Sequence, residues 1–122
     1  MAALGSTIVM FGGFDGTKLL NDTWTWDGTT WTERTIANPP SPRRGHAMAT
    51  IGDKVVLFGG STGIGTETYA NDTWTWDGTT WTPEVVSQSP PGRSSHAMAT
   101  FPGALVAGLS PRAAHSSSVN DK

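Results

Sequence analysis

The chain has 122 residues, of which 36% are hydrophobic and 15% charged, and its formal net charge of -2 points to neither nucleic acid nor an anionic membrane as a partner. It contains no cysteine, which excludes disulfides, thiolate chemistry and cysteine-ligated zinc. No apolar run is long enough to span a membrane and no basic segment precedes the apolar N-terminal run, so we expect a soluble chain without a signal peptide, its compartment undetermined.

The first strand signal is the run Ile8 to Phe11, which is apolar on both alternate faces and ends at the glycine pair Gly12 and Gly13. A short β-branched and aromatic run bounded by glycines predicts a strand. Because both alternate faces are apolar, we expect this strand to be buried on both sides.

A tryptophan-rich hairpin is predicted next, within the stretch NDTWTWDGTTWT at residues 21–32. Alternation with period two places Trp24 and Trp26 on one face of a strand and threonines on the other. The Asp27-Gly28 pair then supplies a turn into a strand that carries Trp31.

The rest of the chain repeats this pattern with a period of about fifty residues, the length of a kelch propeller repeat. After a proline-rich break at residues 37–42, an HAMAT strand and a second apolar run lead to another glycine pair. The stretch NDTWTWDGTTWT then recurs unchanged at residues 71–82, and a further HAMAT follows at residues 96–100. We expect four strands in each unit and find no helical periodicity.

These features resemble the kelch family, whose blades combine a diglycine after the second strand with two aromatics separated by six residues. Tryptophan replaces the usual tyrosine at the first aromatic position, which is a mild departure. The resemblance implies an all-β fold, a partial kelch-type β-propeller built from antiparallel blades of up to four strands, without significant helix. The repeated structural positions are Gly12, Gly13, Trp24, Trp31, Arg43, His46, Gly59, Gly60, Trp74, Trp81, Arg93 and His96.

The repeat divides the chain into four segments. Residues 1–47 are expected to hold an incomplete first blade, with only its second to fourth strands, and the start of the next. Residues 48–93 form the second repeat, and residues 94–108 hold the first strand, His96 to Phe101, and a degraded second strand of a third. Residues 109–122 are small, polar and aperiodic, which predicts a disordered tail.

The aromatic and basic repeat residues are interpreted as structural. All six tryptophans lie inside the two identical stretches, so packing between blades explains them better than a ligand platform. Arg43 and Arg93 are expected to pair with repeat acids such as Asp22 and Asp72, or with backbone carbonyls between blades. The histidines lack the spacing of ligands on one element, so we expect no metal site.

One segment resembles an enzyme motif. The stretch GGSTGIG after the strand at residues 55–58 is similar to the cofactor loop of short-chain dehydrogenases, but a strand pattern follows where a helix is required. Tyr69 also lacks the lysine four residues later that this family uses. The kelch-type copper oxidases need a cysteine that the chain does not have. We therefore expect no cofactor and no catalytic residue.

The leading hypothesis is a non-enzymatic recognition or scaffold module, a fragment of a longer propeller that binds a protein partner through interblade loops. The candidate residues lie after each glycine pair, where the two units differ: Phe14, Asp15, Lys18, Ile64, Glu67 and Tyr69. Two alternatives remain open. The chain could be a piece of a glycan-binding or sugar-active propeller, and identical chains could associate head to tail to complete a ring.

Overall fold

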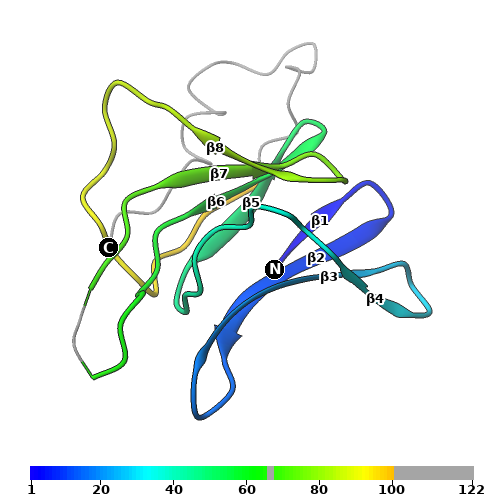
Figure 1. Cartoon of the computed structure of the whole chain (residues 1–122). Helices are drawn as coiled ribbons and strands as arrows, with labels where there is room; N and C mark the ends of the chain where they lie inside the picture. Colours follow the sequence, from blue (N-terminus) through cyan, green and yellow to red (C-terminus); the bar gives the residue numbers. More distant parts are fainter. Residues whose placement is uncertain (66–67, 101–122) are drawn as a thin grey trace.

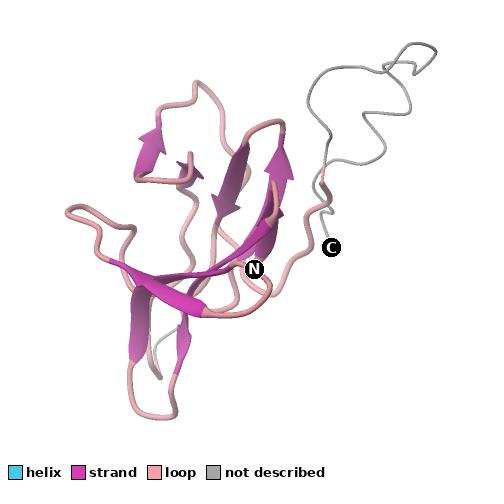
Figure 2. Cartoon of the chain, turned by 90° about the vertical axis from the view of Figure 1, so that its right-hand side faces the viewer, coloured by secondary structure: helices cyan, strands magenta, loops and turns pink. Residues whose placement is uncertain are grey.

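The computed structural model describes residues 1–65 and 68–100, and it is all-β (Figure 1). Two four-stranded antiparallel sheets lie next to each other, and the described residues contain no helix (Figure 2). The first sheet has the order β1 (Ala2–Leu4), β2 (Thr7–Phe14), β3 (Leu19–Trp26) and β4 (Trp31–Arg34). The second sheet has the order β5 (Ala47–Ile51), β6 (Lys54–Phe58), β7 (Thr73–Trp76) and β8 (Trp81–Glu84).

The two tryptophan hairpins close through the same turn. In the first, the backbone N–H groups of Thr29 and Thr30 both donate to Oδ1 of Asp27, each at 2.8 Å. Asp77 accepts from Thr79 and Thr80 in the same way at 2.8 and 2.9 Å. A short acidic side chain that caps its own turn fixes the register of the hairpin.

The first sheet has one strand more than the sequence led us to expect. We expected only the second to fourth strands, but Ala2–Leu4 forms the inner strand β1 and pairs with β2, so that Ala2 faces Val9. This strand is only three residues long and carries no β-branched side chain, so its sequence gives a weak strand signal. Hydrogen-bond pairing with β2, whose sequence strongly favours a strand, stabilises β1 despite its weak strand propensity.

A first strand of a third repeat was expected from His96 to Phe101, and the described part of this segment does not form one of the named strands. Residues 96–100 belong to none of the eight strands, and within them only Ala97 makes an isolated bridge. The expected degraded second strand and the expected tail, together with Phe101, lie outside the described residues.

The core lies between the two sheets and draws on both. Its buried members are Val9, Phe11, Met48, Val55, Leu57, Trp76 and Trp81. The ring of Trp81 lies 5.5 Å from that of Phe11, edge to face, and its Nε1–H donates to Oγ1 of Thr23 at 2.9 Å. One indole therefore joins the second sheet to the first by both packing and a hydrogen bond.

The two identical tryptophan stretches differ in how deeply their side chains are buried. Trp76 and Trp81 are 1% and 3% exposed, whereas Trp31, the equivalent of Trp81, is 40% exposed. Trp24, Trp26 and Trp74 are half-buried. Because the local sequences are identical, the neighbouring sheet decides which copy is buried.

Candidate functional site

Arg43 lies in the connection between the two sheets, and its main chain binds the first sheet. Its N–H donates to the carbonyl of Leu20 at 3.2 Å, and its carbonyl accepts from the N–H of Gly13 at 2.9 Å. The main chain of the connection is therefore bound to the first sheet at the ends of β2 and β3.

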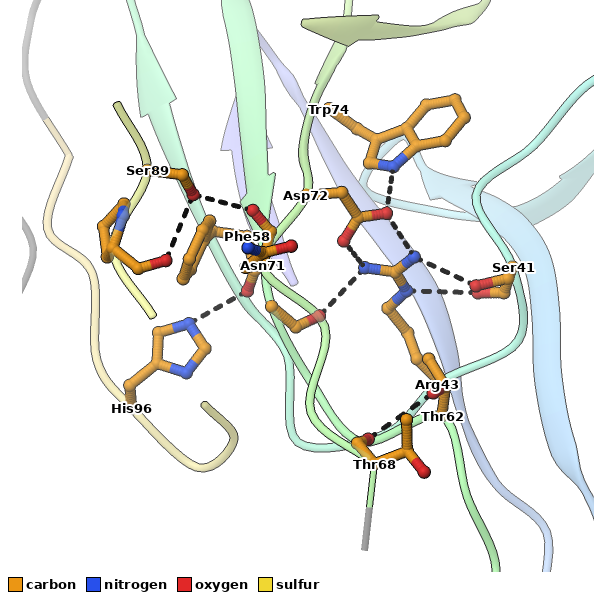
Figure 3. Close-up of polar contacts among 12 residues, drawn as sticks. Ser41, Arg43, Phe58, Thr62, Thr68, Asn71, Asp72, Trp74, Ser89 and His96 are labelled. Carbon is orange, nitrogen blue, oxygen red and sulfur yellow. Dashed lines mark hydrogen bonds and ion pairs between the residues drawn. The ribbon is translucent and has the colours of Figure 1, made fainter. Parts of the chain in front are cut away.

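The side chain of Arg43 reaches in the other direction, into the second sheet (Figure 3). Its Nη1 and Nη2 donate to the two carboxylate oxygens of Asp72 at 2.7 and 2.8 Å, and Nη1 also donates to the carbonyl of Gly59 at 3.0 Å. Ser41 accepts two further bonds, at its carbonyl and its hydroxyl, both at 3.1 Å. The guanidinium is 1% exposed and fully satisfied, as a buried cation must be.

Asp72 is held in place by a tryptophan. Nε1–H of Trp74 donates to Oδ2 of Asp72 at 2.7 Å, and the same bond joins Trp24 to Asp22 at 2.8 Å in the first sheet. Burial opposes ionisation of Asp72, but the hydrogen bonds from Arg43 and Trp74 outweigh it and lower the pKa of this carboxyl.

The two repeated histidines pack against the neighbouring sheet. His96 donates from Nε2 to the carbonyl of Phe58 at 2.9 Å, and its ring lies 5.6 Å from that of Phe58. His46 and Phe11 have the same ring separation of 5.6 Å. Burial lowers the pKa of both imidazoles, that of His46 to about 4, so both are neutral at pH 7.

The first glycine of each pair makes room for this arrangement. A Cβ on Gly59 would lie 2.7 Å from the carbonyl oxygen of Arg93 and 2.9 Å from the ring of His96. A Cβ on Gly12 would lie 2.9 Å from the carbonyl oxygen of Arg43. The repeated Gly, Arg and His positions therefore form one structural unit at each sheet, and the described residues contain no group of three potential metal ligands.

The loop candidates of the first sheet include an exposed aromatic ring. Phe14 ends β2 and is 38% exposed, and the guanidinium carbon of Arg44 lies 4.6 Å from the centre of its ring. Asp15 accepts from the N–H groups of Thr17 and Lys18, both at 2.8 Å, and these bonds lower its pKa. Asp15 therefore shapes the turn, and Lys18 is exposed on it.

The loop candidates of the second sheet are connected to Arg44 through Ser61. The main chain of Ser61 exchanges two hydrogen bonds with that of Arg44, at 2.7 and 3.0 Å, and forms a second bridge with Tyr69. Tyr69 is 46% exposed and Ile64 53% exposed. Glu67 lies outside the described residues.

The structure thus brings Phe14, Arg44 and Tyr69 to the same end of the sheets. Arg44 was missed by the sequence reasoning, although one signal was present, since the equivalent position in the next repeat is Ser94. Its guanidinium has no hydrogen-bond or ion-pair partner within residues 1–65 and 68–100. An arginine held on an aromatic face with open donors is suited to binding a carboxylate.

The two four-stranded antiparallel sheets lie next to each other at their inner strands, where β1 contacts β5. Sheets arranged in this way are blades of a β-propeller. The KLHDC2/KLHL20/DRC7 Kelch-repeats domain model matches residues 1–121. The chain belongs to the kelch-repeat family, and the expected all-β, kelch-type fold is confirmed.

Three curated proteins illustrate the similarity. The human Rab9 effector protein with kelch motifs is 38% identical over 68 residues, which is 51% of this chain and 18% of that protein. Adagio protein 3 of Arabidopsis thaliana is 42% identical over 66 residues, 50% of this chain and 11% of that protein. A probable serine/threonine-protein kinase of Dictyostelium discoideum is 36% identical over 61 residues, which is 46% of this chain and 5% of that protein.

The matches therefore cover a small part of the length of each of these relatives. Kelch-repeat domains commonly serve as protein-interaction modules. No helix long and apolar enough to cross a membrane occurs in residues 1–65 or 68–100.

Proposed function

We propose that the chain is a non-enzymatic binding module that recognises a protein partner through a loop surface consisting of Phe14, Arg44, Ile64 and Tyr69. The observation that supports it best is the guanidinium of Arg44, held 4.6 Å above the exposed ring of Phe14. The rigid sheets on which these loops are built limit the ordering cost of binding.

The chemistry of the loop surface indicates what the partner carries. Arg44 offers a planar set of donors that matches a carboxylate, while Phe14, Ile64 and Tyr69 offer apolar area. The partner segment is therefore expected to place an acidic side chain beside an apolar or aromatic one. Asp15, Lys18 and Glu67 are proposed as flanking contacts that adjust selectivity.

A peptide-display selection on the purified chain tests this proposal. Enriched peptides should share an acidic residue next to an apolar one, and Arg44→Ala or Phe14→Ala should weaken their binding by at least about ten-fold, because central arginine and aromatic contacts dominate such interfaces. Lys54→Ala is the matched control. It removes an exposed cation at the start of β6, at the end of this strand away from the loop surface, and the variant should bind normally. Equal binding by all three variants would contradict the assignment.

Glycan recognition is a second candidate because Trp31 presents an indole that is 40% exposed. Aromatic faces stack on sugar rings, so a saturable change in tryptophan fluorescence on titration with neutral oligosaccharides, abolished in Trp31→Ala, would support this role. The absence of any change would leave the protein-binding proposal alone.

A further inference from the structure

His46 lies where the connection between the two sheets enters β5, and it contacts both sheets. Its ring packs edge to face on that of Phe11 in the first sheet, with the ring centres 5.6 Å apart. On the other side, a Cβ placed on Gly60 would meet the Cβ of His46 at 2.9 Å and its main-chain nitrogen at 3.1 Å. Because both contacts are close, the imidazole cannot move far without moving its own main chain.

One nitrogen of this imidazole has no partner. His46 makes a hydrogen bond to the carbonyl of Phe11, whereas its Nδ1 is buried without a hydrogen-bond partner within residues 1–65 and 68–100. The neutral ring therefore donates through Nε2 and carries no proton on Nδ1. Protonation would bury both a charge and an N–H donor that has no acceptor, and both are unfavourable.

The charged and titratable groups that face this ring also oppose its protonation. They are the guanidinium of Arg43, the imidazole of His96 and the amino group of Met1. Burial is the larger cause, and it lowers the pKa of His46 from 6.5 to about 4, although the bond to Phe11 acts in the opposite direction. A displaced and hydrated imidazole has an ordinary pKa. Acidification therefore favours a conformation in which His46 has left this position.

The segment that carries His46 is fixed at both of its ends. Before it, Arg43 is bound by its main chain to the first sheet and by its side chain to Asp72. After it, Ala47 begins β5 and pairs with Phe58. Residues 44–46 lie between these two fixed points, so a displacement of His46 has to be accommodated within them.

Arg44 and Gly45 are the two other residues of this segment. Gly45 has a φ of 71°, in the left-handed region that glycine adopts without strain, and it can change conformation more easily than any other residue type. Arg44 is held by a main-chain pair with Ser61, in which its N–H donates at 3.0 Å and its carbonyl accepts at 2.7 Å. Ser61 also forms a bridge with Tyr69. The contacts of His46 thus lead directly to the loop surface.

We propose that His46 is a pH switch for the loop surface: on protonation it leaves its position between the sheets, the main-chain pair of Arg44 and Ser61 opens, and the partner is released. The guanidinium of Arg44 then no longer lies over Phe14, so the carboxylate of the partner loses its donors. The inference rests on the proposed function, because it describes the regulation of the same surface. The two sheets remain folded when the switch opens.

Native-state hydrogen exchange of the 122-residue chain tests the opening without any partner. The amide protons of Arg44 and Ser61 are the two donors of the pair. Corrected for intrinsic rates, their protection should fall by at least about ten-fold between pH 7 and pH 5. Low concentrations of urea should leave their exchange unchanged, because a local opening exposes little surface. Exchange that accelerates with urea as steeply as that of amides in the centres of β2 and β6 would overturn the proposal.

Substitutions assign the opening to one imidazole. His46→Phe keeps a ring that cannot be protonated, so the protection of the two amides should change by less than about two-fold over the same range. His46→Gln can still donate to the carbonyl of Phe11 and should give the same result with a smaller side chain. His96→Phe is the matched control at the equivalent repeat position and should retain the fall of the wild type. An undiminished fall in both His46 variants would overturn the assignment.

Binding measurements separate the switch from the proposed function. A peptide enriched on the chain at pH 7 should bind the wild type at least about five-fold more weakly at pH 5, and the His46 variants less than about two-fold more weakly. Carboxylates of the peptide stay largely ionised at pH 5 and do not cause this loss. Binding that weakens in Arg44→Ala but is equal at both pH values would overturn the switch and leave the loop surface in place. Opening at pH 5 without any enriched peptide would support the switch and contradict the proposed function.

Discussion

Arg43 determines how the two sheets are held at the residue scale. A buried guanidinium is tolerated only when its donors are satisfied, and here a carboxylate, two carbonyls and a hydroxyl satisfy them. Its main chain binds the first sheet while its side chain binds the second. Loss of the counter-ion therefore leaves an uncompensated charge between the sheets.

Asp72→Ala and Asp22→Ala form a matched pair that isolates the loss of the counter-ion of Arg43. Each variant removes one hydrogen bond from a tryptophan, but only Asp72→Ala also removes the partner of Arg43. Breaking a fully buried pair costs about 3–5 kcal/mol, and because Asp72 is 41% exposed we expect a loss of about 2 kcal/mol. Asp22→Ala should lose less than about 1 kcal/mol. Urea unfolding in dilute solution measures both, and equal losses would contradict the role of Arg43.

His46 makes the stability depend on pH. Burial lowers its pKa from 6.5 to about 4, assisted by Arg43, His96 and the amino group of Met1, whereas the bond to the carbonyl of Phe11 raises it. The unfolded chain therefore binds more protons than the folded chain between these values. Stability is full above about pH 6.5 and falls by up to about 3 kcal/mol as the pH approaches 4.

Urea midpoints measured from pH 7 to 4.5 check this dependence. His96 adds a loss of the same sign, because burial lowers its pKa as well. His46→Phe keeps a ring of similar size but cannot be protonated, so its midpoint should fall less over this range. A variant with the same slope as the wild type would show that other groups titrate.

At the element scale, the second glycine of each pair offers another comparison. Gly13 and Gly60 occupy equivalent positions with φ of 115° and 106°, so alanine costs about 1–2 kcal/mol in backbone strain at either. Only Gly60 has close neighbours, namely His46 and the carbonyl of Arg44. Gly60→Ala should therefore be less stable than Gly13→Ala by a further about 1–3 kcal/mol, measured by urea unfolding in dilute solution.

Local sequence predicted most of the sheet architecture. The runs Ile8 to Phe11 and Val55 to Phe58 have strong strand propensity, and the Asp-Gly turns determine the tryptophan hairpins. Strand β1 could not be foreseen because three residues of weak propensity depend on pairing with β2. The family resemblance supplied the arrangement of strands as blades.

The candidate site was harder to predict than the fold. The loops could be located because they differ between repeats, but Arg44 is recognisable only when its position over Phe14 is known. Likewise, identical stretches cannot reveal that Trp31 is exposed and Trp81 is buried. Such differences arise from long-range contacts, which local patterns do not encode.

At the scale of the whole molecule, the two sheets depend on one shared core. A blade in a repeat protein buries its apolar faces only against its neighbours, so its stability comes largely from the interface. Here that interface includes Phe11 from the first sheet and Trp81 from the second. Damage to either side should therefore destabilise both sheets together.

Trp81→Ala and Trp31→Ala test this coupling with one residue type in one local sequence. Trp81→Ala removes a buried ring and should lower the free energy of unfolding by about 3–5 kcal/mol. Trp31→Ala should lower it by less than about 1 kcal/mol in dilute solution, because its ring is half open to solvent. Far-ultraviolet circular dichroism reports both sheets, and the remaining tryptophans report each tertiary environment. Coincident transitions in both signals are expected for every variant, and two separated transitions would show that the blades unfold independently.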